Sequence, residues 1–288
     1  MSNLSTKKIE EPGWSFLRSP RWLGYYALII VFSIACVFLG NWQFDRREQA
    51  RAEIDRIDTN YDALAIGIEE ALPTLDHFDL DKNKWHPVKV RGAYVGEPFL
   101  ARNRVSASGV GSLLVHPLQL ENGQIFFVDR GWVPVNVTAG IPDALPMPAQ
   151  GQVEVTARLR QSEALISNRE TLGSTVGSIN LPELESLVGQ SAYTGSYGQL
   201  VSESPQGETG ELAPKPERDE GPHLSYALQW YVFILIVLGG AGYAASLEWK
   251  SLNTTAARKK RASKDLLNRN QKKLTDAEEE DAYLDAES

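Results

Sequence analysis

Few residues of this chain stand in a pattern that is typical of catalysis or metal binding. The single cysteine, Cys36, excludes an intrachain disulfide, a C-x-x-C thiol pair and the C-x-x-C-H signature of covalent haem attachment. His77, His86 and His116 lack the short spacings of a metal site, and the last two precede prolines, which indicates strand ends. The fourth histidine, His223, begins a long apolar stretch, where an imidazole can bind a ligand or simply cap the segment.

Two apolar blocks without acidic or basic residues, 23–42 and 223–247, must position His223. Each has about 20 residues or slightly more, enough to cross about 30 Å of hydrocarbon as an α-helix. Backbone amides in lipid must be satisfied within the segment, so both blocks are predicted to be transmembrane helices. A cleaved signal peptide is the alternative for the first block, but the polar run before it is long and no small-x-small site follows. Aromatic residues near the block ends resemble interfacial belts: Trp22, Tyr25, Tyr26, Trp42, Tyr226, Tyr243 and Trp249.

Basic residues decide the predicted orientation. They precede the first block and follow the second at Lys7, Lys8, Arg18, Arg21, Lys250, Arg258, Lys259, Lys260, Arg261 and Lys264. The positive-inside rule therefore places segment 1–22 and tail 248–288 in the cytoplasm, and residues 43–222 outside it. Three arginines at 46, 47 and 51 weaken this vote, but long domains translocate largely regardless of charge. Membrane lipids are thus expected partners, whereas the net charge of −8 argues against nucleic acid.

The segment between the blocks predicts an α+β domain with a mainly antiparallel sheet or a small barrel. Apolar residues at helical spacing indicate a leading helix over 45–72, which Pro73 ends. Alternating patterns indicate strands over 85–94, 111–120, 124–128, 152–160 and 192–201. The Asn122-Gly123 pair predicts a hairpin, and a short helix is expected over 182–188. Residues 202–222 form an acidic, proline-rich stretch, predicted as a flexible linker, and the polar tail after Trp249 is expected to be disordered.

Four motifs in this order resemble the surfeit locus protein 1 family of cytochrome c oxidase assembly factors. They are GNWQFDRR at 40–47, NRVSASGVG at 103–111, VDRGWVP at 128–134 and PHLSYALQWYVF at 222–233. The resemblance covers about residues 18–248. Where the family's second span usually begins Asn-x-His, this chain has Gly221-Pro222-His223, so the histidine is kept and the asparagine is not.

The resemblance implies a non-enzymatic role in building the haem a centre of the oxidase catalytic subunit, by holding or delivering haem a. The implied partners are that subunit or its assembly intermediate, and the haem a synthesis machinery. His223 would then ligate the haem iron, since a helix N-terminus favours the neutral imidazole that iron needs. Trp42, Tyr226 and Trp230 would supply aromatic contacts to the porphyrin. No other metal is expected, and the alternative remains an interfacial histidine that merely caps the span.

Two further motifs have two interpretations each. Asp129, Arg130 and Trp132 in DRGWVP are interpreted as a structural corner with an ion pair, or as a docking surface for the oxidase. Asn103 and Arg104 precede a flexible run and are interpreted as turn residues, or as partner-binding residues.

Two other classes of protein compete with the assembly factor. A two-span sensor needs a cytoplasmic output module, for which a tail of about 40 polar residues is too small. A membrane-anchored hydrolase needs a nucleophile elbow, a metal motif or a close acid pair, and none is recognisable. The absence of an Arg- and Ser-rich transit peptide favours a bacterial plasma membrane over a mitochondrial inner membrane.

Overall fold

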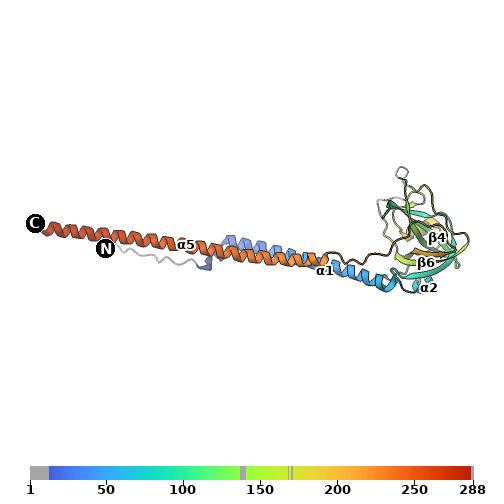
Figure 1. Cartoon of the computed structure of the whole chain (residues 1–288), viewed down its shortest axis with the longest axis horizontal. Coiled ribbons are helices and arrows are strands. Elements are labelled where there is room, and N and C mark those ends of the chain that lie inside the picture. The colour runs from blue at the N-terminus through green and yellow to red at the C-terminus, as the bar shows by residue number, and fades with distance from the viewer. Residues whose placement is uncertain (1–12, 137–140, 168, 170, 287–288) are drawn as a thin grey trace. The chain divides into compact units, whose positions relative to one another are not determined.

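The structure is a computed structural model that describes residues 13–136, 141–167, 169 and 171–286, with side chains up to residue 269. Two units make up the chain. One joins residues 1–48 to residues 221–288, and its described part is helical. The other, residues 49–220, contains the sheet. In Figure 1 the helical unit is drawn in blue and in orange to red, and the sheet unit in cyan to yellow.

The helical unit contains two candidate membrane spans. A short 3-10 helix, η1 (Trp14–Arg18), precedes α1 (Pro20–Asn60), and α5 (His223–Ala286) ends the described chain. The most apolar windows of α1 and α5 have mean hydropathies of 2.3 and 1.8, and only 11% and 6% of them are buried. A core helix of a soluble protein would bury its apolar residues, so this exposure favours lipid as their surroundings.

The tail after Trp249 differs from the expectation of disorder. It continues α5 without a break to Ala286. The physical reason lies in its composition, because no glycine or proline occurs beyond Gly242 and strong helix formers such as Ala, Leu, Lys, Arg and Glu dominate. Low apolar content was therefore a poor guide to backbone conformation in this segment.

The sheet unit is built from eight strands and three short helices. The strands are β1 (Ile66–Gly67), β2 (Pro87–Tyr94), β3 (Phe99–Ser106), β4 (Gly109–Leu120), β5 (Ile125–Pro134), β6 (Gln152–Gln161), β7 (Thr175–Val176) and β8 (Ser196–Ser204). The helices are α2 (Ile68–Ala71), α3 (Leu80–Asn83) and α4 (Leu181–Val188). The strand order is β1-β2-β6-β8-β5-β4-β3-β7, and a further pairing of β2 with β4 closes β2, β6, β8, β5 and β4 into a ring.

The sheet is mixed rather than mainly antiparallel, and its closed ring of strands agrees with the other expectation, a small barrel. Strand β1 lies parallel to β2, β7 parallel to β3, and β8 parallel to β5. A hairpin can join only antiparallel strands. The chain leaves β5, passes through β6, β7 and α4, and returns as β8, so the direction of β8 could not be read from any turn signal.

The predicted hairpin at Asn122-Gly123 is confirmed, since β4 and β5 pair antiparallel on either side of it. Gly123 has φ +82°, a conformation that glycine adopts without strain and that is strained for other residues. Phe126 and Phe127 then fall in different core clusters, as alternation along a strand requires. Strand β5 runs on to Pro134, well beyond the predicted end at residue 128.

Two other boundaries differ from expectation. The helix predicted to reach residue 72 ends at Asn60, and the apolar residues beyond it enter β1 and α2. Strand β3 occupies a stretch that was expected to be a turn. Its alternation is interrupted at Asn103, which has φ +60° and lies where the register with β4 shifts. Such a bulge breaks the period-two pattern that would have revealed the strand.

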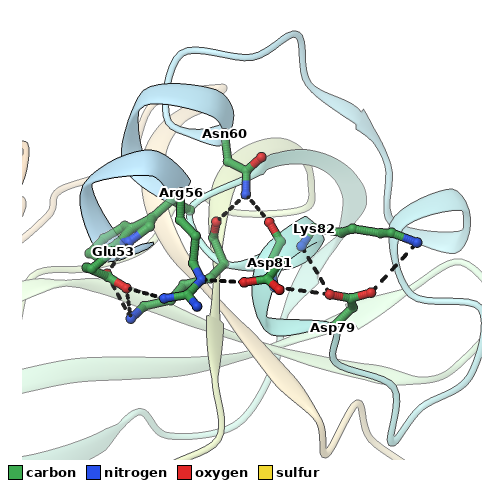
Figure 2. A network of polar contacts seen from close by, with 8 residues as sticks. Glu53, Arg56, Asn60, Asp79, Asp81 and Lys82 are labelled. Carbon is green, nitrogen blue, oxygen red and sulfur yellow. Dashed lines mark hydrogen bonds and ion pairs between the residues drawn. The ribbon is translucent and has the colours of Figure 1, made fainter. Parts of the chain in front are cut away.

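Polar contacts fix the last turns of α1 to the sheet unit, as Figure 2 shows. Glu53 accepts a hydrogen bond from Trp85 Nε1 at 2.8 Å, and Arg56 Nε donates to the Asp81 carboxylate at 2.7 Å. Asn60 Nδ2 donates to the Asp81 carbonyl at 2.8 Å. Because Trp85 also packs on Ile57 of α1 and on Tyr61, which directly follows it, this end of α1 belongs to the folded unit rather than to a free linker.

Candidate functional site

A heptad seam joins α1 and α5 in the helical unit. The less exposed positions of α1 include Trp22, Tyr26, Ile29, Ser33, Cys36, Gly40, Gln43 and Arg47. Those of α5 include His223, Ala227, Trp230, Ile234, Val237, Ala241, Ala245 and Glu248. Steps of three and four residues are the pattern of two helices packed as a coiled coil. Small residues in the seam, Cys36, Gly40, Ala227 and Ala245 among them, let the two backbones approach closely.

His223 lies at one end of this seam and is held by Gln43. Its Nδ1 is 2.9 Å from Gln43 Oε1. An amide oxygen can only accept, so in the neutral form of His223 the proton lies on Nδ1 and Nε2 has the lone pair. About two turns further along α5, Tyr231 donates to Asn41 Oδ1 at 2.9 Å, and its ring covers Gly40.

The opposite end of the seam is also polar. Trp22 Nε1 donates to Glu248 at 3.0 Å, and Arg21 forms an ion pair with the same carboxylate. Trp22 and Gln43 are separated along α1 by about 30 Å at 1.5 Å per residue. This distance matches the thickness of a bilayer's hydrocarbon core, so polar contacts close the helix pair where each end would meet water.

The aromatic residues proposed to contact a porphyrin do not lie together. Trp230 is in the seam, two turns along α5 from His223, and its ring meets Phe233 edge-on. Trp42 and Tyr226 lie outside the seam, with 50% and 49% of their surfaces exposed. The structure therefore brings His223 to Gln43, the neighbour of Trp42, rather than to Trp42 itself. Gly239, Gly240 and Gly242 are likewise outside the helix contact.

In the sheet unit, Arg130 of the DRGWVP motif is the centre of a buried polar network. The Arg130 and Glu203 side chains are 0% and 1% exposed and form an ion pair at 3.4 Å. Tyr94 OH donates to Glu203 at 2.7 Å, and the Arg130 guanidinium lies 4.8 Å from the Tyr94 ring centre. Arg130 also donates to the Glu208 carbonyl, and Gly207 N donates to Glu203 at 3.0 Å. Arg130 is thus inside the unit and forms the ion pair that the structural interpretation of the motif predicts.

Burial sets the protonation of the groups beside Arg130. His116 was expected at a strand end but lies within β4, buried against the Tyr94 ring at 5.0 Å. Burial lowers the pKa of His116 to about 4, because the charged imidazolium would lose its hydration. Burial and the hydrogen bond to Glu203 both raise the pKa of Tyr94. A neutral histidine and a neutral tyrosine therefore surround the ion pair at pH 7.

Asp129, the first residue of the motif, faces away from this network. Its carboxylate is buried and accepts a hydrogen bond from Gly131 N at 3.0 Å. Burial raises the pKa of Asp129 to about 6, and the charges of Arg160 and Arg104 offset only part of that rise. Gly131 has φ +106°, and the chain at Gly210 passes close to it. A Cβ added to Gly131 would lie 2.8 Å from the Gly210 backbone. The motif is therefore a buried strand segment rather than a corner, and the interpretation of Asp129 and Trp132 as a docking surface stays a prediction.

Asn103 and Arg104 belong to β3 rather than to a turn. Arg104 forms an ion pair with Glu163, and its carbonyl accepts a hydrogen bond from Trp132 Nε1 at 3.0 Å. Asn103 makes the bulge that places these groups. The partner-binding interpretation of these residues is untested and stays a prediction.

Sequence reasoning missed Gln43 and Glu203. A helix that is apolar on every side gives no amphipathic signal, so the seam position of Gln43 could not stand out. Glu203 was assigned to the linker, although β8 continues through it.

Two apolar helices, each long enough to cross a membrane, flank a mainly sheet-forming unit in the sequence, which defines the class as a sheet-domain protein with two candidate membrane spans. The sequence model of the SURF1 family matches residues 30–235. Uncharacterised SURF1-like proteins of Mycobacterium bovis and of two Mycobacterium tuberculosis strains are 31% identical to this chain over 243 residues. These matches cover 82% of this chain and 88% of each relative. The chain therefore belongs to the SURF1 family, which confirms the resemblance.

Proposed function

We propose that the protein is a non-enzymatic assembly factor for haem–copper cytochrome c oxidase that assists formation of the haem a centre. Family membership carries this proposal, because SURF1 proteins are known in general as cytochrome oxidase assembly factors. The partner would be the oxidase catalytic subunit or an assembly intermediate of it. The two candidate spans support a membrane location. We place it in a bacterial plasma membrane, with both termini cytoplasmic as the basic residues outside the spans favour.

Haem a would be the cargo, bound at the end of the helix pair that carries His223. The residues there fit such a role in one respect, namely that the hydrogen bond to Gln43 orients His223 with its Nε2 lone pair available. Metal-binding histidines are commonly held in this way through their other ring nitrogen. Iron ligation by a neutral imidazole would fix the porphyrin, while Trp230 and the exposed rings of Trp42 and Tyr226 offer aromatic surface nearby.

Deletion of the gene tests the assembly role. We expect the haem a absorbance band of the membranes to fall selectively, while the bands of other cytochromes remain. Complementation with the wild-type gene should restore the band. Normal haem a absorbance in the deletion strain would refute the assembly role.

Purification from a host that makes haem a tests the cargo separately. Wild-type protein should show Soret absorbance, His223→Ala should lose it, and Gln43→Leu should weaken it by removing the group that orients the imidazole. His77→Ala, in the sheet unit, is the matched control and should leave the absorbance unchanged. Absorbance that is absent from wild type, or unchanged in His223→Ala, would remove haem binding and leave the assembly role standing.

A further inference from the structure

A cavity opens in the sheet unit where β5 and β8 separate. These strands pair in parallel only at Val128 with Gly198 and at Asp129 with Gln199. Beyond that point the chain at Glu211 takes the place of β8 beside β5. Backbone hydrogen bonds of 2.8 Å run both ways between Glu211 and Trp132. The result is a pocket between the diverging strands, which residues 211–214, here called the strap, help to close.

The lining of this cavity is apolar with acidic groups and has no basic one among the described lining residues. Its volume is about 290 Å³, at the small end of ligand pockets. Leu113, Trp132 and Leu200 form much of its apolar wall. The polar groups include the carboxyl groups of Asp129, which is buried, and Glu211, which lies at the exposed side.

The buried carboxylate of Asp129 has no salt-bridge partner among the described residues. Gly131 N and the Gln199 side chain donate hydrogen bonds to it, and the charges of Arg104 and Arg160 act on it without a salt bridge. Arg104 instead pairs with Glu163, and Arg160 lies 4.0 Å from the Trp85 ring centre. Buried charges in proteins are normally paired, since an unpaired one loses its hydration without compensation. A cation that entered the cavity would supply the missing partner.

We propose that this cavity binds a lysine or arginine side chain that a partner polypeptide presents. The aliphatic stem would lie along the apolar wall, and the charged head would reach Asp129 and Glu211, as such side chains do at other interfaces. This inference does not rest on the proposed oxidase or haem function.

The surface around the mouth favours a polypeptide over a free amine. Val105, on the lining, and Val110, its cross-strand neighbour, are 81% and 60% exposed. Leu212 of the strap is exposed beside them. A small amine would leave these side chains in water, whereas a polypeptide that inserts one basic residue would also cover them.

The test uses full-length protein in detergent micelles, labelled with 5-fluorotryptophan and observed by ¹⁹F NMR. The Trp132 resonance, assigned through Trp132→Phe, reports occupancy of the cavity. The probes are the peptide acetyl-Ala-Leu-Lys-Leu-Ala-amide, the same peptide with norleucine for lysine, and n-butylammonium. We expect the lysine peptide to bind at least about tenfold more tightly than the norleucine peptide, the scale of one charge-assisted hydrogen bond.

Asp129→Asn should abolish that preference, and Glu211→Gln, at the exposed mouth, should reduce it without disturbing the core. Glu121→Gln, an exposed carboxylate on the β4–β5 turn, is the control and should leave it unchanged. Binding should weaken as the pH falls below about 6, where Asp129 takes up a proton. Equal binding of both peptides, or a preference that survives Asp129→Asn, would overturn the proposal. Binding of n-butylammonium as tight as that of the lysine peptide would overturn the polypeptide as occupant.

Discussion

Replacing Asp129 by asparagine should stabilise the sheet unit at neutral pH. The pKa of this buried carboxyl is raised from 3.8 to about 6, so the folded protein holds its proton more tightly than the unfolded chain. Stability from this group is fully present below about pH 4 and is lost as the pH rises through about 6. At 1.36 kcal/mol per pH unit the loss reaches about 3 kcal/mol at pH 7.5. Asparagine keeps the shape and can still accept from Gly131 N, but it carries no charge to bury.

The assay is thermal unfolding of full-length protein in detergent, followed by near-ultraviolet circular dichroism at pH 4 and pH 7.5. For a unit of this size, about 3 kcal/mol corresponds to roughly 6–12 °C in Tm. We expect Asp129→Asn to raise Tm by that order at pH 7.5 and to change it little at pH 4. Glu121→Gln serves as the control for an exposed carboxylate. An equal change at both pH values, or a less stable variant at pH 7.5, would refute the argument that burial of the charge is what costs stability.

His116 gives the same experiment a second readout. Its pKa is lowered from 6.5 to about 4, so its contribution is fully present above about pH 6.5 and is lost as the pH falls through about 4. The two groups therefore act in opposite directions over this range and largely cancel in the wild type. In Asp129→Asn the contribution of His116 is no longer cancelled. The Tm of this variant should therefore rise steeply from pH 4 to pH 6.5. A variant with a flat profile would contradict the assignment to His116.

Three further substitutions each test a contact inside one of the two units. Arg130→Met should destabilise the sheet unit by about 3–5 kcal/mol, because it leaves Glu203 as an unpaired buried charge; an unchanged urea midpoint would contradict this. Gly40→Leu should separate α1 from α5, since even a Cβ there would lie 2.9 Å from an aromatic ring of α5. Gly24 has open space around it, so Gly24→Leu is the control and should leave the helices together. Spin-label distances between α1 and α5 measure the effect of both substitutions. Glu53→Gln should lower the free energy of unfolding by about 1–2 kcal/mol, because Trp85 donates to a charged acceptor at this position. Hydrogen exchange in the last turns of α1 should become faster. Slower or unchanged exchange would argue against the role of the polar contacts in Figure 2.

Local patterns in the sequence were enough for the features that depend on neighbours along the chain. Two uncharged stretches of membrane length predicted α1 and α5, and Asn122-Gly123 predicted the hairpin between β4 and β5. Alternation predicted β6, whose Val153, Val155 and Leu159 are buried as one face requires. In each case the deciding interaction lies within a helix, a turn or a strand.

Tertiary structure decided what the distant parts of the chain do together. The hydrogen bond from His223 to Gln43 depends on the register of two helices separated by the whole sheet unit, and an all-apolar helix does not reveal which face it pairs. The ion pair of Arg130 with Glu203 depends on closure of the strand ring. The cavity at Asp129 exists only because β8 arrives parallel to β5 and then diverges. A buried charge pair or pocket forms between surfaces that meet on folding, so its physical cause is absent from any short stretch of residues.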